Sequence, residues 1–367
     1  MEGMENLNFR VNLFNNIYQN KKVFLTGNTG FKGSWMAFWL QKLGANVVGY
    51  SLESNTTPNH FSLLGLDYQT YFHNICDLDF LQKSMIEADP EIVFHLAAQP
   101  LVRYSYINPI ETYQTNVMGT VNLLEASRNC KNLKAIVVIT TDKCYENIGQ
   151  KEGYKEIDRM GGFDPYSSSK GAAEIVVSSY RNSFFNLEVF QKEHNTLVAS
   201  ARAGNVIGGG DWSMDRLIPD IIISAVKTEK TLIRYPKSTR PWQHVLEPIF
   251  GYLLLGEKLL NAQKEFAEAW NFGPEENETL TVEEVLRVAE KHWNKIQYEA
   301  DQNHNHFHEA NLLSLNIDKA KIKLGWNPKW NSAMAIEKTI NWYKEYYAHK
   351  QLLTELDLKN YINNIIQ

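Results

Sequence analysis

Short apolar runs alternate with longer amphipathic segments through the first half of the chain. The runs are rich in Val, Ile, Phe, Tyr and Thr, which is typical of buried strands. The predicted strands cover residues 21–27, 46–52, 69–78, 91–98, 134–141 and 194–204. The intervening segments have apolar residues at helical spacing, and the predicted helices include 31–45, 79–88, 113–129 and 171–185. Strands that alternate with helices predict an α/β fold with a doubly wound parallel sheet.

The alternation stops after Gly208. Gly, Pro and Trp become frequent, and the predicted helices at 218–227, 244–260 and 335–350 are separated by short mixed elements. We therefore predict a large α/β domain over residues 20–203. A smaller mixed α/β lobe is predicted over 204–367, interleaved so that parts of it return to the first domain.

Composition and charge exclude several classes of function. The net formal charge is -5, and no dense run of Lys and Arg is present, which argues against nucleic-acid binding. No uninterrupted apolar stretch reaches roughly 18 residues, so we expect no membrane span. The first residues lack the pattern of a signal peptide, and Cys76, Cys130 and Cys144 are scattered, so we expect reduced thiols in a cytoplasmic protein.

A glycine-rich turn follows the first predicted strand. In "TGNTGFKG", Gly27, Gly30 and Gly33 are spaced by three residues and open a helix. Glycine suits a tight turn, a close backbone approach to a pyrophosphate and close packing of the helix. The pattern indicates a dinucleotide site, although an ordinary strand-to-helix turn could also contain it.

Two pairs of polar residues add candidate chemistry. Tyr166 and Lys170 in "PYSSSK" are four residues apart before a helical pattern, so both can share one helix face. An ammonium near a phenol would lower the pKa of the phenol, and Tyr166 could then exchange a proton with a sugar hydroxyl. Asp142 and Lys143 follow the apolar run 134–141 and could equally form a solvated turn.

These motifs together resemble the extended short-chain dehydrogenase/reductase family, the NAD-dependent epimerases and dehydratases. The resemblance covers residues 20–345 and implies a Rossmann-type domain with a nucleotide-sugar-binding lobe. It implies NAD as a tightly bound, recycled cofactor. The implied cofactor residues are Gly27, Thr29, Gly30, Phe31, Gly33, Asp77, Leu78, Leu96, Ala97, Ala98, Asn116, Tyr166 and Lys170. Asn28 departs from the histidine of the related group, and the second strand has no carboxylate at its tip, although Glu53 lies close.

Within the family, "GFKGSW", "TTDKCYEN", "RAGNVIGGGDW" and "RPWQHVLEP" are similar to the 4,6-dehydratases that act on CDP-glucose. This resemblance implies C4 oxidation, elimination of water across C5 and C6, and return of the hydride to C6. Thr141, Asp142, Lys143, Tyr166 and Lys170 are the implied catalytic residues, with Lys143 in place of a glutamate found in dTDP-glucose enzymes. The implied substrate residues are Gln99, Asn205, Arg216, Arg240, Asn271 and His308.

The ionisation of Lys143 stays open at this point. It could be a base with a depressed pKa or a charged stabiliser of the enolate. The histidines of "HNHFHEA" alternate on a polar loop without a carboxylate cage, so we expect no metal.

Other functions use part of the same motifs. A dehydratase for another nucleotide sugar, such as dTDP-glucose, would keep all of them. A nucleotide-sugar 4-epimerase would need Tyr166 and Lys170 but not the Asp142–Lys143 pair. A non-catalytic dinucleotide sensor would keep only the glycine turn. We expect a homodimer or homotetramer, and a role in the synthesis of deoxysugars for lipopolysaccharide O-antigen.

Overall fold

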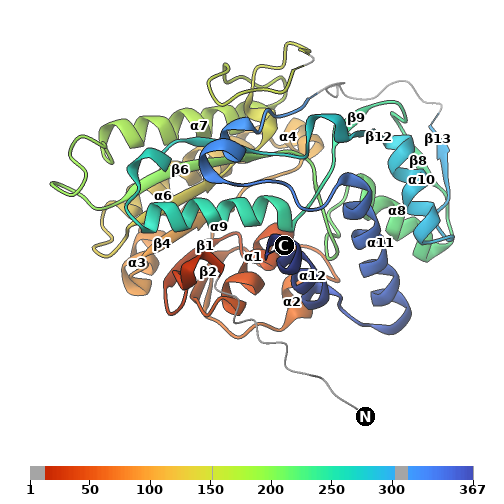
Figure 1. Ribbon diagram of the computed structural model, residues 1–367, viewed down its shortest axis with the longest axis horizontal. Helices are drawn as coiled ribbons and strands as arrows, with labels where there is room; N and C mark the ends of the chain where they lie inside the picture. The colour runs from red at the N-terminus through yellow and green to blue at the C-terminus, as the bar shows by residue number, and fades with distance from the viewer. Residues whose placement is uncertain (1–12, 151, 302–312, 367) are drawn as a thin grey trace.

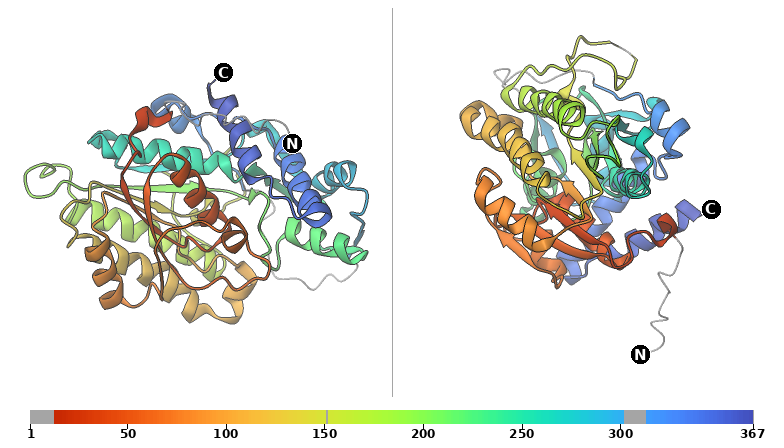
Figure 2. Two further views of the ribbon diagram at one scale, coloured as in Figure 1. Left: turned by 90° about the horizontal axis from the view of Figure 1, so that it is seen from below. Right: turned by 90° about the vertical axis from the view of Figure 1, so that its left-hand side faces the viewer.

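A parallel sheet lies between two layers of helices in the computed structural model, which describes residues 13–150, 152–301 and 313–366 (Figures 1 and 2). The strand order is β11-β6-β5-β4-β1-β2-β3, and all neighbouring strands are parallel. The strands are β1 Lys22–Thr26, β2 Asn46–Ser51, β3 Thr70–Phe72, β4 Ile92–His95, β5 Ala135–Ile139, β6 Leu197–Ala203 and β11 Ala269–Phe272. The predicted α/β fold with a doubly wound parallel sheet is confirmed.

Period-two alternation explains why helices cover both faces of this sheet. On β1, Val23 and Leu25 face one buried cluster, whereas Phe24 faces the other. The helices of the first face are α1 Phe31–Lys42 and α9 Leu246–Leu260, and those of the second are α3 Leu78–Ala88, α6 Gly119–Ser127 and α7 Pro165–Ser183. The right-hand view of Figure 2 shows α3, α6 and α7 side by side along that second face.

One predicted strand was too long, and one strand of the sheet was not predicted. Residues 69–78 form only the short strand β3, because Asn74 accepts hydrogen bonds from two following amides and Asp77 caps α3. The edge strand β11 was not predicted. It lies after residue 204 and pairs with β6, and α9 also returns to the sheet. The boundary between 203 and 204 stays a prediction.

The remaining elements form most of a second lobe beside the sheet (Figure 1). Small two-stranded sheets pair β7 Val206–Ile207 with β10 Gln243–His244, β8 Thr231–Ile233 with β13 Tyr298–Ala300, and β9 Thr239–Pro241 with β12 Thr279–Thr281. The helices of this part of the chain are α8 Leu217–Lys227, α10 Val282–His292, α11 Ser332–His349 and α12 Thr354–Ile366. The sequence predicted 335–350 as the last helix, so α12 was missed. Its buried apolar residues Leu358, Tyr361 and Ile362 are at helical spacing and are interrupted by polar residues.

Short helical turns connect the main elements. They are η1 Leu13–Asn16, α2 His60–Leu64, α4 Val102–Ile107, α5 Pro109–Tyr113, η2 Gln114–Met118, η3 Asp142–Cys144, η4 Lys264–Phe266, η5 Glu276–Glu278 and η6 Ala320–Leu324. Within the described ranges, no helix combines the length and the apolar character needed to cross a bilayer.

Candidate active site

A cavity of about 1030 Å³ opens where the parallel strands end. The ends of β1, β2, β4, β5 and β6 contribute to it through Gly27, Ser51, Leu96, Thr141 and Gly204. The opposite wall comes from residues 211–220 and 231–235 of the second lobe. The chain order reverses between β1 and β4, and ligands of doubly wound sheets bind at such a reversal.

Two glycines of the turn after β1 stand where a side chain has no room. Gly27 has φ +71°, and a Cβ there would lie 2.7 Å from the Ala97 nitrogen. A Cβ on Gly33 would lie 2.0 Å from the Gly27 carbonyl oxygen. Gly30 is the N-cap of α1 and no side chain caps the helix, so its first N–H groups stay available for an anion. The turn fits the pyrophosphate of a dinucleotide.

The neighbouring strand tip is polar. Thr29 lies against the end of β2, where its Oγ1 is 2.8 Å from the Ser51 hydroxyl and donates to the Leu52 carbonyl at 2.9 Å. Glu53 lines the cavity just beyond. Asn28, the departure noted in the turn, is buried and donates to Tyr68 and Thr70 instead. Its side chain therefore points away from the cavity lining, which Gly27, Thr29 and Gly30 supply in this turn.

The segment after β5 brings Thr141, Asp142 and Lys143 into the cavity. Thr141 caps η3, and its hydroxyl donates to the Asp142 carboxylate at 2.9 Å. Burial raises the pKa of Asp142, while the charge of Lys143 and the Thr141 hydrogen bond act in the opposite direction. Asp142 is therefore more easily protonated than an exposed aspartate.

Tyr166 and Lys170 lie one turn apart on α7, and both are buried against the cavity. The predicted lowering of the Tyr166 pKa is wrong. Burial raises the pKa to about 12, although hydrogen bonding with Thr141 and the charge of Arg216 act in the opposite direction. The Lys170 ammonium instead donates to the Ile139 carbonyl at 3.4 Å. Burial lowers the Lys170 pKa to about 8, whereas the charge of Glu174 raises it.

Lys32 is a cavity residue that sequence reasoning missed. Its Nζ donates to the Tyr252 hydroxyl at 3.2 Å and lies 5.5 Å from that ring's centroid. Burial lowers its pKa to about 7, and the charges of Lys170 and Arg216 lower it further. Its position inside the glycine turn, in "GFKG", was the available signal.

The remaining predicted residues divide into three groups. Asn205, Arg216 and Arg240 line the cavity, as do Phe31, Leu96, Ala97 and Ala98. Arg216 pairs with Asp211 at 2.8 Å, and Arg240 donates to the Thr239 carbonyl. His308 lies outside the described residues.

The third group holds the scaffold and does not line the cavity. Asn116 accepts from the Gln99 amide and donates to Ser169, and Gln99 itself holds the following loop through Leu101. Asn271 was predicted to contact the substrate, but it does not line the cavity. Its side chain accepts a hydrogen bond from Tyr145 and donates to two backbone carbonyls. Asp77 is half exposed and bonds His73 and the Phe80 amide, and Leu78 begins α3 beside it.

Within the described ranges, no three His, Cys, Asp or Glu side chains are grouped so as to hold a metal ion.

Comparisons with known proteins agree with this geometry. The family model described as GDP-mannose 4,6-dehydratase matches residues 24–339. The chain is 47% identical to the CDP-glucose 4,6-dehydratase of Salmonella typhimurium, over 92% of this chain and 94% of that protein. It is 26% identical to a dTDP-D-glucose 4,6-dehydratase of Dictyostelium discoideum, over 88% of this chain and 82% of that protein.

Solved structures share the fold. The dTDP-glucose 4,6-dehydratase of Bacillus anthracis, determined in complex with NAD, has a TM-score of 0.72 and 22% identity, over 89% of this chain and 97% of that one. An epimerase of Methanothermobacter thermautotrophicus has a TM-score of 0.78 and 22% identity, over 91% and 95%. The predicted resemblance is confirmed: the chain belongs to the nucleotide-sugar 4,6-dehydratase family, whose model matches from β1 into α11.

Proposed function

We propose that the protein is an NAD-dependent CDP-glucose 4,6-dehydratase, a hydro-lyase that forms CDP-4-keto-6-deoxyglucose. The observation that carries the proposal is a single cavity lined by the glycine turn, the Tyr166–Lys170 pair and the Thr141–Lys143 segment. The 47% identity to a CDP-glucose 4,6-dehydratase supports the choice of sugar nucleotide. A role in O-antigen deoxysugar synthesis and a cytoplasmic location stay predictions.

The glycine turn would hold the NAD pyrophosphate, and Lys170 would hold the nicotinamide ribose. When bound, NAD would take a hydride from C4 of the sugar and return it to C6. The crowded Gly27 and Gly33 positions support this assignment, because only backbone lines the turn there. Asp77, Leu78 and Asn116, which were also predicted as cofactor residues, would support the segments around the cofactor site.

Tyr166 would accept the proton of the C4 hydroxyl. The Thr141 hydroxyl, which donates to Asp142 in this structure, would turn to donate to the C4 oxygen of the bound sugar. Burial keeps the phenol protonated, so Tyr166 needs positive charge beside it before it can act as a base. Arg216 already acts in that direction. Loss of the C4 hydrogen gives a ketone, which acidifies the C5–H bond.

Asp142 and Lys143 would divide the elimination. Since burial raises the Asp142 pKa, this residue is suited to hold a proton and deliver it to the departing C6 oxygen. Lys143 would then serve C5 in one of two ways. As a neutral amine it would accept the C5 proton while Asp142 protonates the C6 oxygen. As a charged ammonium it would stabilise the enolate, and an ionised Asp142 would take the C5 proton and pass it to the departing C6 oxygen.

Arg216, Arg240 and Asn205 would bind the diphosphate and nucleoside from the second lobe. Guanidinium groups match phosphate oxygens in charge and geometry. Gln99 would affect substrate binding indirectly, through the loop that it holds. His308 stays predicted as a substrate-binding residue. Asn271 is no longer proposed as a substrate contact.

Two alternatives are separated from this proposal by the Asp142–Lys143 pair. A 4-epimerase has no elimination to perform, and it would keep activity after Asp142→Asn. A sensor would bind cofactor without turning over any sugar. A dehydratase for dTDP-glucose uses the same residues, so only the nucleotide preference separates it.

The decisive experiment offers CDP-, dTDP-, UDP- and GDP-glucose to the purified protein. We expect a 4-keto-6-deoxy product, detected by its absorbance in alkali and by mass spectrometry, from CDP-glucose above the others. Conversion of CDP-glucose into CDP-galactose without loss of water would establish the epimerase instead.

We also propose that the protein is a homodimer or a homotetramer built on a dimer. Large apolar side chains are exposed on consecutive segments of α4, α5 and η2, namely Tyr104, Ile107, Ile110, Tyr113 and Met118. Ile107 and Ile110 are the most exposed, at 74% and 73%. A second copy of the chain would cover this face. Light scattering should give a mass of two or four chains, and Ile107→Lys/Ile110→Lys should give a monomer.

A further inference from the structure

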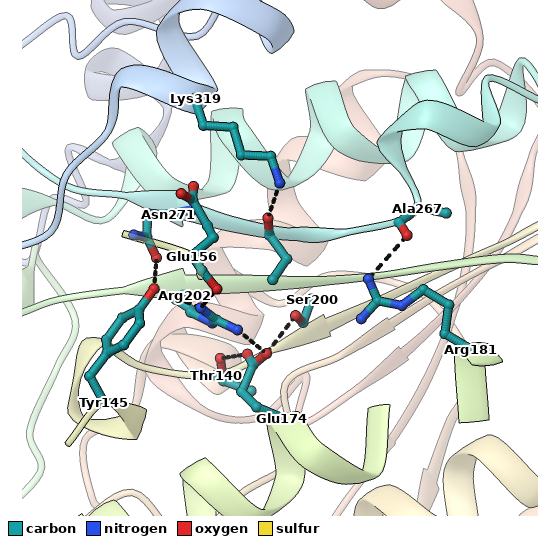
Figure 3. A network of polar contacts seen from close by, with 11 residues as sticks. Thr140, Tyr145, Glu156, Glu174, Arg181, Ser200, Arg202, Ala267, Asn271 and Lys319 are labelled. Atoms are coloured by element: carbon teal, nitrogen blue, oxygen red, sulfur yellow. Dashed lines mark hydrogen bonds and ion pairs between the residues drawn. The ribbon is translucent and has the colours of Figure 1, made fainter. Parts of the chain in front are cut away.

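An ion pair lies buried behind the catalytic segment, outside the cavity (Figure 3). Glu174 on α7 and Arg202 on β6 are 3% and 4% exposed, and Arg202 Nη2 donates to Glu174 Oε2 at 2.7 Å. Glu174 follows Lys170 by four residues, as Lys170 follows Tyr166. One face of α7 therefore presents all three side chains in a row.

Glu174 holds the start of the catalytic segment. Thr140, the residue before Thr141, donates its hydroxyl to Glu174 Oε1 at 2.5 Å. Ser200 on β6 donates to the other carboxylate oxygen at 2.7 Å. The carboxylate thus joins α7, the end of β5 and β6 at one point.

Arg202 holds the other end of the same segment. Its Nη1 donates to the Tyr145 hydroxyl at 2.6 Å and to the Glu156 carbonyl at 3.2 Å, and its guanidinium lies 4.9 Å from the Tyr145 ring centroid. Tyr145 in turn donates to Asn271 at 2.8 Å. Tyr145 directly follows η3, so the two partners of one ion pair fix residues 140 and 145.

Stability alone does not account for such a pair. Withdrawing two charges from water costs as much as their attraction returns, and buried pairs can often be replaced by apolar residues without loss of stability. What an apolar replacement cannot supply is a set of directed hydrogen bonds to two ends of a short segment.

We propose that the Glu174–Arg202 pair positions the catalytic segment 140–145 against α7, so that Asp142 and Lys143 keep a fixed distance from Tyr166 and Lys170. Glu174 and Arg202 are positioning residues, because neither touches the cavity. This inference rests on the function proposed above, since it assigns the purpose of the geometry to the elimination chemistry.

Glu174 also acts on Lys170 through charge. The ionisable groups that interact with this ammonium are Glu174 on α7, Cys144 in η3, Lys32 on α1 and His95 on β4. Glu174 raises the Lys170 pKa against the effect of burial. Loss of the Glu174 charge should therefore let Lys170 release its proton at a lower pH.

The test compares Glu174→Gln, the double variant Glu174→Leu/Arg202→Met and the control Glu268→Gln with the unaltered protein. Glu268 directly precedes β11 and pairs with Lys319, and no contact joins its half-exposed side chain to residues 140–145. The double variant removes both charges together, so it should fold even where Glu174→Gln leaves Arg202 unpaired.

Three measurements are made on each protein. With CDP-glucose, kcat should fall about 10²-fold in Glu174→Gln and in the double variant, with little change in KM. A displacement of the reacting groups by about 1 Å has an effect of that size. Hydrogen exchange of the amides of residues 141–145 should become faster. The pH midpoint for acetylation of Lys170, followed by peptide mass spectrometry, should move down in both. Glu268→Gln should match the unaltered protein throughout.

The proposal is overturned if the folded double variant keeps the unaltered kcat and the unaltered amide exchange. It is also overturned if Glu268→Gln produces the same losses, since any nearby charge would then suffice. If the unaltered protein turns over none of the sugar nucleotides, the proposed function fails. Amide exchange and Lys170 acetylation still decide whether the pair positions the segment.

Discussion

Lys143 differs from its neighbours in the cavity by being only partly buried, at the surface of η3 next to a buried aspartate. Its charge opposes the effect of burial on the Asp142 pKa. A change at this position therefore alters both groups that the elimination needs.

We expect Lys143→Met to stop the reaction after C4 oxidation. The glycine turn is a separate element, so the variant should fold and bind NAD. Product formation should fall about 10²- to 10⁴-fold, the usual contribution of a general acid or base. Reduced cofactor should accumulate on the enzyme, as measured by its absorbance, and solvent deuterium should enter C5 more slowly than in the unaltered protein. Normal turnover with normal exchange at C5 would mean that the Asp–Lys pair is a structural turn.

Tyr166→Phe tests the first stage. The phenyl ring can occupy the buried site, so binding of the sugar nucleotide should persist, measured by calorimetry. C4 oxidation should be lost, and no reduced cofactor should appear even in a single turnover, because no other base is proposed at that hydroxyl. A variant that still reduces its cofactor at the unaltered rate would transfer this role to another group.

At the scale of the element, the strand–turn–helix unit of β1 and α1 depends on two glycines for its shape. The Gly33 position is the more crowded, because a Cβ there would overlap the Gly27 carbonyl. The backbone itself must move to accept any side chain.

Gly33→Ala should therefore weaken NAD binding by opening the turn and shifting α1. Titration of the protein with NAD, followed by quenching of tryptophan fluorescence, measures the effect. Gly273→Ala is a matched control, since its Cβ would meet only ordinary contacts of 3.5–3.9 Å. Equal NAD affinity in the two variants would show that the turn does not hold the dinucleotide.

At the scale of the whole molecule, Glu247 ties α12 and the segment before α11 to α9, which packs on the sheet. This fully buried residue of α9 accepts from the amides of Lys329 and Trp330 and from the Tyr361 hydroxyl of α12. Burial raises its pKa to about 7, although these hydrogen bonds act in the opposite direction. Burial also raises the pKa of Asp357 on α12 to about 7.

The raised pKa of Glu247 makes the stability of the fold depend on pH. Between the unfolded pKa near 4.5 and the folded value near 7, the folded state holds a proton that the unfolded state has released. Stability should thus decline as the pH rises through this window, by up to about 3 kcal/mol for Glu247. Glu247→Gln should remove this part of the decline, measured by urea unfolding across the window, whereas the exposed control Glu290→Gln should not. An unchanged pH slope in Glu247→Gln would show that the carboxylate is ionised throughout.

Much of the site could be predicted because its signals are local. The spacing of Gly27, Gly30 and Gly33, the four-residue interval from Tyr166 to Lys170, and the position of Asp142 after a strand each depend on a few consecutive residues. Backbone geometry then places strand ends at one edge of a parallel sheet, so the cavity follows from the order of the elements.

Long-range packing decided the rest. Nothing adjacent to β11 shows that it completes the sheet, because that pairing joins residues far apart in the chain. Asn271 is held by Tyr145 from a distant segment, and Lys32 lies beside Tyr252, a contact between α1 and α9. The raised pKa of Tyr166 was likewise unpredictable, because desolvation depends on every group that surrounds the phenol. The sequence by itself determined which residues could meet at the strand ends, since those patterns are local. Only the tertiary structure decided which of them face the cavity and in what ionisation state, since burial is a property of the assembled chain.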